Sequence, residues 1–355
     1  MSIRVVRALP QDKWRCFVDE HPQGNIFHTP EMFQVFSRTR GHQPTLWASV
    51  SDDGHVLALL LPVQLCLMDG LLRHLTMRAV VYGGGLYVSG AEGQQALDML
   101  LRNYTQEVDR ATLFTELRNL SDMDTAQPVL CKHGFVHEGH LNYLIDLKRP
   151  PEAILQSIGH RTRKRVRQAI RRGEVVIEEV TQPEQLSACY DLLRNTYRAA
   201  RVPLADRSLF EAVLNVLHPL GMVRVTLARV GSIPIATSVE LLYKDLIYGW
   251  YGGMDRAYDS YHANELLMWH ILQWGSENGY RLYDFGGAGK PDEGYGVRDF
   301  KAKFGGKLVE FGRNTCVHSR LRLEVSQIGY YLYRQLAIPG LFDRLQILRA
   351  INSSE

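Results

Sequence analysis

The sequence is poor in cysteine and has no cysteine pair at the spacing of a metal site. The five cysteines of the 355-residue chain stand far apart, at Cys16, Cys66, Cys131, Cys189 and Cys316. No CxxC pair and no cysteine–histidine cluster occurs, so the sequence disfavours both a zinc site and a disulfide framework. We therefore expect no bound metal and a protein suited to the reducing cytoplasm.

Long apolar runs are also lacking. The first residues, MSIRVVRALPQDKW, contain no apolar core of a signal peptide. The most apolar stretch, residues 56–68, is interrupted by Pro62 and Gln64 and is shorter than the roughly 20 residues that a membrane helix needs. We expect a cytoplasmic protein, attached at most to the inner face of the membrane.

The chain has little net charge. Its 41 Lys and Arg against 38 Asp and Glu leave a net charge of +3, which is too small by itself to indicate nucleic-acid binding. We expect no DNA partner. Hydrophobic residues make up 45% and charged residues 22%, the profile of an ordinary globular protein, and the length predicts about two domains.

The two halves of the chain share one order of expected elements: a strand, a glycine-containing strand, a long helix and a further strand. In the first half these are residues 56–64, 78–87, 93–110 and 112–117, and in the second half 235–243, 245–254, 264–278 and 281–285. Such a repeated order indicates an internal duplication of one α/β (α+β) unit with a mixed, mostly antiparallel sheet. Residues 131–147, KHGF followed by HLNYLIDL, are typical of a hairpin that closes the first unit.

This duplication predicts four parts of the chain. We expect an N-terminal domain at residues 1–148, a basic linker helix at 149–173, a second domain at 174–318 and a helical tail at 319–355. The tail is basic and rich in leucine and aromatic residues. It either packs as two helices around Pro339 or rests on an anionic membrane, as a peripheral contact.

Residues 281–313 contain the strongest candidate site. Asp284 ends a short apolar strand, and Gly286, Gly287 and Gly289 allow a close backbone approach. A polar loop and a basic, aromatic segment, residues 297–304, follow. This arrangement predicts one wall of an active site, although a strand, an exposed loop and a hairpin with no catalytic role would give the same pattern.

Two motifs in this stretch resemble a known family. The tandem halves, with YDFGG at 283–287 and GVRDFKAKFGG at 296–306, resemble the Fem family of aminoacyl (peptidyl) transferases over about residues 24–317. The resemblance implies two tandem GNAT-like domains of the acetyltransferase fold. It also implies transfer of an amino acid from aminoacyl-tRNA to an amine of a peptidoglycan precursor, with Lys301 at the reaction centre.

The sequence departs from two related patterns. Residues 258–264, YDSYHAN, lack the glycine turn that holds a pyrophosphate in acetyl-CoA enzymes of this fold, which disfavours acetyl-CoA as donor. The sequence also lacks the long charged helical arm with which many Fem enzymes bind tRNA. Of the two donors we nevertheless expect aminoacyl-tRNA rather than acetyl-CoA, and we expect no cofactor. Acyl transfer to an amino sugar or another amine of an envelope polysaccharide, and a non-catalytic binding module, remain alternatives.

The expected chemistry assigns roles to residues of the candidate site. A cation near the acyl oxygen stabilises the transition state, and we assign this role to Lys301, with Lys303 and Arg298 as neighbouring anion binders. Asp284 either accepts the amine proton or braces a basic side chain. An extended segment places Lys301 and Lys303 on one face, whereas a helix pairs Arg298 with Lys301.

Further residues are candidates for substrate binding. Phe300 and Tyr295 belong to the same loop, Tyr251 lies on a strand that is either a substrate platform or core, and Glu240 faces either the core or the site. His262 precedes the long helix of the second half, where Asn264 is either a site residue or its cap.

A basic segment at residues 157–172 is a second candidate. It contains seven basic residues, Arg161, Arg163, Lys164, Arg165, Arg167, Arg171 and Arg172. We expect one helix there that meets a phosphate-bearing ligand such as tRNA, with Arg163 and Arg167 as binding residues. The alternative is a linker helix that only faces water.

Overall fold

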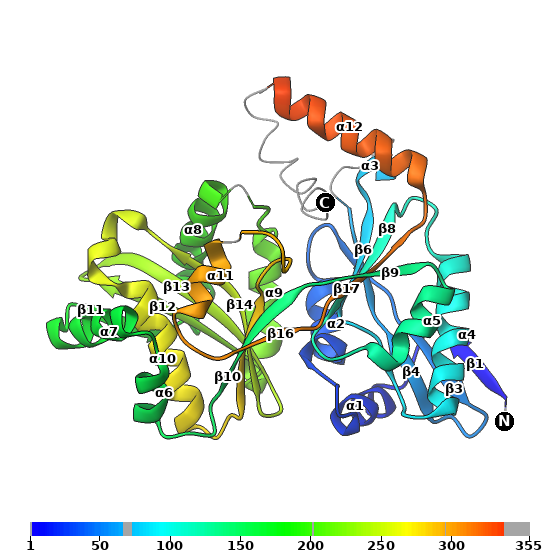
Figure 1. Ribbon diagram of the computed structural model, residues 1–355, viewed down its shortest axis with the longest axis horizontal. Coiled ribbons are helices and arrows are strands. Elements are labelled where there is room, and N and C mark those ends of the chain that lie inside the picture. The colour runs from blue at the N-terminus through cyan, green and yellow to red at the C-terminus, as the bar shows by residue number, and fades with distance from the viewer. Residues whose placement is uncertain (1, 67–72, 201, 295, 337–355) are drawn as a thin grey trace. The chain divides into compact units, whose positions relative to one another are not determined.

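The computed structural model describes residues 2–66, 73–200, 202–294 and 296–336, with side chains described to residue 329. The chain forms two compact units. Unit 1 comprises Met1–Gly139 and Phe311–Glu355, and unit 2 comprises His140–Glu310. Each unit combines β-sheet with covering helices (Figure 1).

Unit 1 contains two sheets. Their strands are β1 (Ile3–Val6), β2 (His42–Pro44), β3 (Trp47–Ser51), β4 (Val56–Leu60), β5 (Pro62–Leu65), β6 (Arg78–Gly83), β7 (Leu86–Tyr87), β8 (Phe114–Asn119), β9 (Phe135–Glu138) and β17 (Arg313–Val317). The strand orders are β1-β3-β4-β7 and β2-β5-β6-β8-β17-β9. Among these neighbours only β6 and β8 run parallel.

The helices of unit 1 cover these sheets. They are α1 (Gln11–Glu20), η1 (Ile26–His28), α2 (Pro30–Ser37), α3 (Arg73–Thr76), α4 (Ala91–Glu107), η3 (Asp124–Ala126), α5 (Gln127–Lys132) and α12 (Arg320–Leu336). Thr29 caps α2, because its Oγ1 accepts a hydrogen bond from the Met32 N–H at 3.2 Å. Leu100 and Tyr104 of α4 pack with Trp47, Leu117 and Phe135 in one core.

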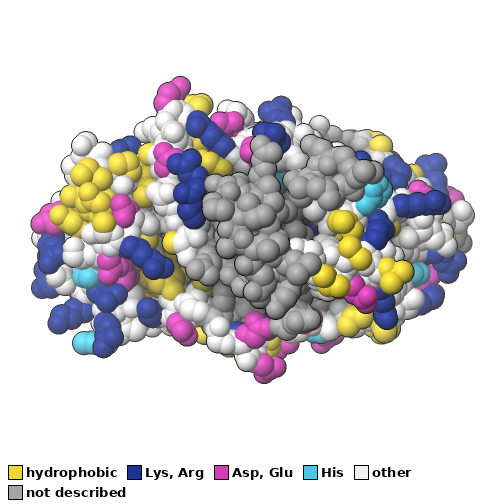
Figure 2. All heavy atoms as spheres, turned by 90° about the horizontal axis from the view of Figure 1, so that it is seen from above, with side chains coloured by type: hydrophobic (Ala, Val, Ile, Leu, Met, Phe, Trp, Pro, Cys, Tyr) yellow, Lys and Arg dark blue, Asp and Glu magenta, His cyan; other side chains and the backbone are white. Residues whose placement is uncertain are grey.

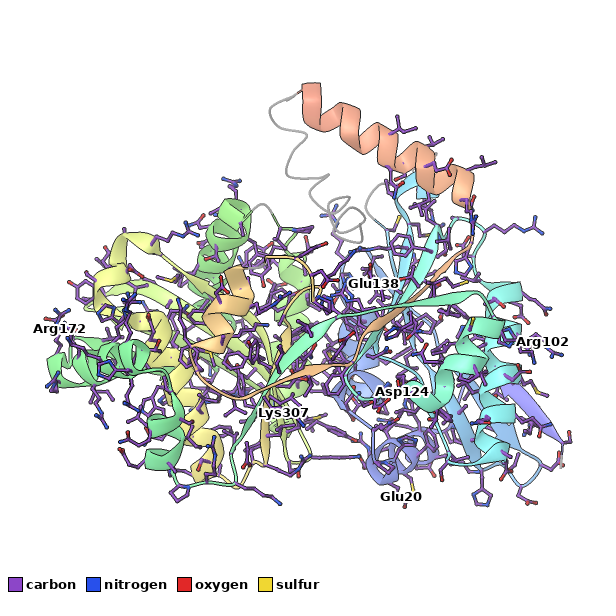
Figure 3. The ribbon with its side chains drawn as sticks, viewed as in Figure 1. Glu20, Arg102, Asp124, Glu138, Arg172 and Lys307 are labelled. Atoms are coloured by element: carbon purple, nitrogen blue, oxygen red, sulfur yellow. The ribbon has the colours of Figure 1, made fainter. Side chains whose placement is uncertain are left out.

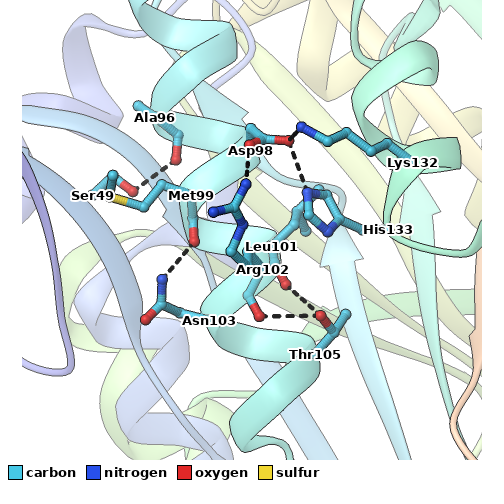
Figure 4. Close-up of polar contacts among 10 residues, drawn as sticks. All are labelled: Ser49, Ala96, Asp98, Met99, Leu101, Arg102, Asn103, Thr105, Lys132 and His133. Carbon is cyan, nitrogen blue, oxygen red and sulfur yellow. Dashed lines mark hydrogen bonds and ion pairs between the residues drawn. The ribbon is translucent and has the colours of Figure 1, made fainter.

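Polar contacts connect α4 to the end of α5 (Figure 4). Asp98 of α4 lies 2.6 Å from Nζ of Lys132 and 2.9 Å from Nε2 of His133. Arg102 lies one turn further along α4, and its Nη2 is 3.4 Å from Asp98. Asp98 is thus the shared acidic partner of several basic side chains near the surface, where such contacts contribute little to stability.

Unit 2 is built on one sheet of seven strands. The strands are β10 (Leu141–Asp146), β11 (Val175–Glu179), β12 (Val223–Val230), β13 (Ile233–Tyr243), β14 (Leu246–Met254), β15 (Leu282–Gly287) and β16 (Lys307–Glu310). Their order is β11-β12-β13-β14-β15-β10-β16. The parallel pair β14–β15 is connected through η5 (Arg256–Tyr261) and α10 (Ala263–Glu277), as a parallel pair requires a crossover.

Helices pack on both faces of this sheet. They are α6 (Pro151–Ser157), α7 (His160–Arg172), α8 (Pro183–Ala200), α9 (Arg207–Leu217), η4 (His218–Leu220), α10 and α11 (Gly296–Ala302). On one face Ile154 of α6, Val166 of α7 and Trp269 of α10 share a core with Tyr283 and Phe285 of β15. On the other face α8 packs on β13 and β14.

The expected duplication is visible in the strand orders. The four strands β6-β8-β17-β9 of unit 1 correspond to β14-β15-β10-β16 of unit 2. In both sets a parallel pair, connected through a long helix, is followed by two antiparallel strands. The strand with Thr115 in unit 1 therefore corresponds to the strand with Asp284 in unit 2.

The expected hairpin at residues 131–147 is wrong. Its two strands enter different sheets: β9 pairs with β17, with Glu138 opposite Arg313, and β10 pairs with β16, with Leu141 opposite Glu310. Two strands with a short connection resemble a hairpin locally, but their hydrogen-bond partners are remote in sequence. The observed units therefore differ from the expected boundaries at 148 and 318, and the basic linker helix lies within unit 2.

The surface carries charges of both signs. On the face drawn in Figure 2, Lys and Arg side chains are interspersed with Asp and Glu, in agreement with a net charge of only +3. Within the described residues, no helix is long and apolar enough to cross a membrane. The second helix expected in the tail lies outside the described residues.

Candidate functional site

The candidate site of unit 2 lies where two parallel strands separate. β14 and β15 pair at three positions only, from Leu246 opposite Leu282 to Tyr248 opposite Asp284. Both strands continue beyond this point, β14 to Met254 and β15 to Gly287. The backbone of the last β15 residues therefore needs other hydrogen-bond partners on the side of β14.

Lys301 binds three backbone carbonyls at this strand end. It lies on α11, and its Nζ donates to the backbone carbonyls of Phe285 at 2.6 Å, Gly286 at 3.2 Å and Gly287 at 2.7 Å. An ammonium group has three N–H donors, so these carbonyls take all of them. Only 9% of the residue is exposed. Burial lowers the pKa of Lys301 to about 8, although the nearby Asp284 carboxyl opposes the shift.

Asp284 is the second buried ionisable group at this strand end. Its carboxyl accepts hydrogen bonds from the Gly286 N–H at 2.7 Å and from Asn142 Nδ2 at 3.2 Å. Burial raises the pKa of Asp284 to about 6, against the opposing effects of these hydrogen bonds and of the Lys301 charge. The strand end thus holds an acid and a base whose pKa values lie on either side of neutrality.

Gly286 allows the two strands to approach each other here. It has a φ of +68°, and a Cβ on it would lie 2.9 Å from the Tyr248 hydroxyl and 3.3 Å from the Gly249 carbonyl oxygen. The Tyr248 hydroxyl therefore lies close to the backbone of Gly286, two residues beyond Asp284. A side chain at position 286 would displace it.

The sequence did not indicate Asn142 as a site residue, and it left Tyr248, like Tyr251, as part of either a substrate platform or the core. Asn142 belongs to β10, which the expected boundaries assigned to the first domain. A signal was present in the sequence, since a polar Asn interrupts the apolar segment HLNYLIDL. Tyr248 alternates with other aromatic residues, which is equally typical of a core strand.

The other residues of the loop bind mainly to the loop itself. Arg298 donates from Nε to the Ala288 carbonyl at 2.8 Å, and its other nitrogens donate to the carbonyls of Pro291 and Lys290. Lys303 is exposed. The segment is helical, so Arg298 and Lys301 lie one turn apart on α11. The guanidinium of Arg298 thus holds the loop, and its expected role as an anion binder stays a prediction.

Phe300 is half-buried and packs against the core, and its expected role in substrate binding stays a prediction. Its ring lies 5.2 Å from that of Phe304, and both pack with the core residues around Phe285. Tyr295 lies outside the described residues, so its expected role stays a prediction.

Glu240 is not brought together with the acid–base pair. Glu240 is 1% exposed and lies on the same face as Leu242, which opposes Ile247 of β14, and Ile247 in turn lies next to Tyr283 of β15. Successive side chains of a strand alternate between faces, so Asp284 points to the opposite face. Burial raises the pKa of Glu240 to about 8, opposed by Ser238 and Arg224.

Tyr251 packs among helices of unit 2. Its ring lies 4.9 Å from Phe210 of α9 and 5.7 Å from Tyr197 of α8, and the residue is half-buried. Of the two expectations, core or substrate platform, this packing favours the core.

His262 directly precedes α10 in a left-handed conformation, with a φ of 55°. Asn264 lies inside the helix, and no side chain caps α10, so the expected Asn264 cap is wrong. Arg165 of α7 reaches this first turn, where its Nη1 lies 2.7 Å from Glu265. The segment before α10 contains no glycine, so a pyrophosphate would meet side chains there rather than a backbone cradle.

The basic helix α7 lies on the α10 side of the sheet, opposite to Asp284. Val166 of α7 shares the core that contains Tyr283 and Phe285. Arg163 donates to the Gln156 carbonyl at 2.6 Å, and Arg167 lies 3.2 Å from Glu152. Neither arginine belongs to the strand-end site. Within the described chain, no group of three or more His, Cys, Asp or Glu residues is arranged to hold a metal ion.

Comparison with known proteins agrees with this fold. Residues 159–301 match the family model described as an acetyltransferase (GNAT) domain, a segment that includes both Asp284 and Lys301. A search of curated protein sequences found no match.

Several solved structures are similar over nearly the whole chain. The crystal structure of FemX superposes with a TM-score of 0.68 at 16% identity, covering 95% of this chain and 100% of that one. The fold is a tandem GNAT-like fold. A tandem GNAT protein from the clavulanic acid biosynthesis pathway gives a TM-score of 0.57 at 11% identity, covering 90% and 99% of the two chains.

A third similar structure is the C-terminal domain of a putative lysylphosphatidylglycerol synthetase from Agrobacterium fabrum. Its TM-score is 0.56 at 14% identity, and the alignment covers 91% of this chain and 96% of that one. At such identities the likeness shows the fold alone. The matched segment places a GNAT acyltransferase domain over most of unit 2.

Proposed function

We propose that the protein is an N-acyltransferase of the Fem type, which transfers an aminoacyl group from aminoacyl-tRNA to an amine of a peptidoglycan precursor. The observation that carries the proposal is the buried pair Asp284 and Lys301 at the point where β14 and β15 separate. The fold shared with FemX and the motifs at residues 283–287 and 296–306 support it.

In this proposal Asp284 acts as the general base. An acceptor amine must lose a proton when its nitrogen attacks the acyl carbonyl, and the ester bond to the donor breaks as the new amide bond forms. With a pKa of about 6, the Asp284 carboxyl is mostly ionised at neutral pH and still close enough to neutrality to exchange a proton readily.

Lys301 supplies positive charge beside the reacting carbonyl. Its three N–H groups bind the β15 carbonyls, so it does not offer a free donor to the substrate in this arrangement. A developing oxyanion would either feel the buried charge through space or replace one of the three carbonyls. Such charge has a strong effect in a site from which water is excluded.

A second candidate is N-acyl transfer from an acyl-CoA to an amino sugar or another envelope amine. The matched acetyltransferase (GNAT) family model favours it. The glycine-free segment 256–262 before α10 argues against it, because bulky side chains occupy the place of a phosphate-binding turn.

One experiment separates the two donors. The protein is incubated with a UDP-linked muropeptide precursor and either labelled aminoacyl-tRNA or labelled acetyl-CoA, and product is measured by mass spectrometry. We expect label transfer from aminoacyl-tRNA and its loss in Asp284→Asn. Asp191→Asn is the control, since Asp191 lies on the outside of α8 and, within the described residues, pairs with the exposed Arg194.

Transfer from acetyl-CoA alone would replace the first proposal with the second. Equal activity of Asp284→Asn and Asp191→Asn would remove Asp284 from the mechanism.

A further inference from the structure

Asn142 connects the strand β10 to the acid of the candidate site. Its Nδ2 donates to both carboxyl oxygens of Asp284, at 3.2 and 3.4 Å. Only 3% of Asn142 and 2% of Asp284 are exposed, so water competes little for these hydrogen bonds. The Gly286 N–H also donates to Asp284, but it belongs to the backbone. Asn142 is therefore a donor to this carboxyl that a substitution can remove.

A bulge in β15 lies beside this contact. Asn142 opposes Gly287 and Leu144 opposes Asp284, so β15 has two residues where β10 has only Tyr143. Bulges are frequent next to active sites, where they redirect a side chain. Side chains two positions apart on a strand share a face, so Asn142 lies on the same face as Leu144 and Asp284.

The backbone of β10 also holds the segment that follows Asp284. The Leu141 N–H donates to the Gly289 carbonyl at 2.9 Å, and the Leu141 carbonyl accepts a hydrogen bond from the Ala288 N–H. Two consecutive residues of β10, Leu141 and Asn142, thus bind the loop and the carboxyl. A functional group supported in this way on a strand keeps one orientation.

The charged and titratable groups around Asp284 come from the neighbouring elements. Lys301 of α11 supplies the positive charge that acts on the carboxyl. Tyr248 opposes Asp284 on β14, and Tyr283 precedes it on β15, with a pKa that burial raises well above its usual value. Lys307 of β16, labelled in Figure 3, lies on the far side of β10 and is exposed. The uncharged Asn142 differs from Lys301, because it lowers the pKa of Asp284 through hydrogen bonds alone.

We propose that Asn142 is a positioning residue of acyl transfer, which holds the Asp284 carboxylate in the ionised, oriented form that accepts the amine proton. This inference rests on the proposed function, because it takes Asp284 as the base. The proton passes from the amine nitrogen to the carboxylate, while Asn142 donates only to the carboxylate oxygens. Loss of this donor disfavours the ionised form and should raise the pKa of Asp284 above its value of about 6.

The test measures kcat/KM of acyl transfer from pH 5 to 9 in the wild type, in Asn142→Leu and in Asn142→Asp. We expect Asn142→Leu to move the acidic limb up by about one pH unit, because the ionised carboxyl loses a donor. Activity should therefore fall more at pH 6 than at pH 8. Asn142→Asp keeps the shape of the side chain but places a second carboxyl beside Asp284. Two such groups share a proton, so the limb should move further up.

Asn314→Leu is the matched control. Asn314 is a fully buried asparagine on β17, the strand of unit 1 that corresponds to β10, and its Nδ2 donates to Gln127 at 2.7 Å. We expect this variant to lower the melting temperature without moving the acidic limb. A second readout needs no substrate, since infrared difference spectra with Asp284→Asn as reference titrate the Asp284 carboxyl. This titration should move with the limb in both Asn142 variants.

An acidic limb and a carboxyl titration that stay unchanged in the folded Asn142 variants would overturn the inference, as would an equal shift in Asn314→Leu. A uniform loss of kcat without a shift would mean that Asn142 has a structural role only. If Asn142→Leu does not fold, Asn142→Asp gives the same decision. If no donor gives product with the wild type, the proposed function falls, and the carboxyl titration still decides whether Asn142 holds Asp284 in its ionised form.

Discussion

Asp284 and Lys301 are both buried at the end of β15, and burial acts on them in opposite directions. It raises the pKa of the carboxyl to about 6 and lowers that of the ammonium to about 8. Desolvation disfavours the charged form of each group. At pH 7 both groups remain mainly charged, but each lies within about one pKa unit of exchanging its proton.

These values predict a bell-shaped pH profile for acyl transfer. If ionised Asp284 is the base and protonated Lys301 stabilises the transition state, kcat/KM rises as pH increases through about 6 and falls above about 8. We expect Asp284→Asn to lose the acidic limb and about two to four orders of magnitude in kcat. The measurement is steady-state kinetics from pH 5 to 9. An acidic limb that persists in Asp284→Asn would belong to the acceptor amine instead.

Replacement of Lys301 tests both of its roles. Lys301→Met removes a buried charge and leaves three β15 carbonyls without their donor, so we expect a lower melting temperature and a kcat lower by about two to three orders of magnitude. KM should change less, because the charge acts mainly in the transition state. Lys301→Arg should rescue poorly, since a planar fork cannot reproduce three converging hydrogen bonds.

Lys303→Met is the matched control, since Lys303 is exposed and lies two residues away. We expect it to affect KM more than kcat and to leave the melting temperature unchanged. Near-normal turnover of a folded Lys301→Met protein would show that the strand-end site does not use this lysine.

At the residue scale, the sequence predicted Asp284 and Lys301 as site residues, and the structure buries them near each other, but it did not predict the side chains around them. Both lie in recognisable motifs close to each other in the chain. Asn142 bonds to Asp284 across 142 positions of sequence, a relation that local patterns do not contain. The side to which Glu240 points depends on strand register, including a bulge at Val239 and Glu240, which no periodicity rule predicts.

Among the elements, β15 depends on Gly286 for its approach to β14. Gly286→Ala places a Cβ 2.9 Å from the Tyr248 hydroxyl and strains a backbone with a φ of +68°. Gly221→Ala imposes similar strain, at a φ of +66°, with no atom within 4 Å of the added Cβ. We expect Gly286→Ala to lower the melting temperature more than Gly221→Ala and to reduce kcat. Thermal unfolding and steady-state kinetics of the two variants give the comparison. Equal melting temperatures and equal kcat values would mean that the strand end tolerates displacement of the Tyr248 side chain.

The basic helix α7 is the second element with a testable role. Arg163 and Arg167 make only exposed contacts to Gln156 and Glu152, so they can exchange these for phosphates. If α7 binds tRNA, Arg163→Met with Arg167→Met should weaken binding and reduce its dependence on salt concentration. Filter binding at several salt concentrations measures both. An unchanged slope would support a helix that only faces water.

Local periodicity predicted most helices, but it did not predict which strands pair with partners that are remote in sequence. The helices expected at residues 93–110 and 264–278 correspond to α4 and α10, because an apolar stripe is contained in the local sequence. The strands β9 and β10 were also expected, but as partners. Strand partners depend on contacts remote in sequence, and here the true partners β17 and β16 follow about 170 residues later.

At the scale of the whole molecule, unit 2 is inserted into a hairpin of unit 1. β9 and β17 pair with Glu138 opposite Arg313, and β10 and β16 pair with Leu141 opposite Glu310. The chain thus leaves unit 1 and returns to it at adjacent positions of one antiparallel pair. The six-stranded sheet of unit 1 is complete only when both β9 and β17 are present, and the sheet of unit 2 is complete only when both β10 and β16 are present.

This connectivity predicts that the units separate at the observed boundaries and not at residue 148. Residues 140–310, expressed alone, should fold cooperatively, because the fragment contains every strand of its sheet. Unit 1 should also fold when Asn-Gly replaces residues 140–311, since Gly139 and Gly312 then continue the register in which Glu138 faces Arg313, and a two-residue turn can connect β9 to β17. A fragment of residues 1–148 lacks β17, which leaves β8 and β9 without their shared partner, and it should aggregate or remain unfolded. Circular dichroism and thermal unfolding of the three proteins make the comparison. A stable 1–148 fragment together with an unfolded 140–310 fragment would show that the strand exchange does not define the folding units.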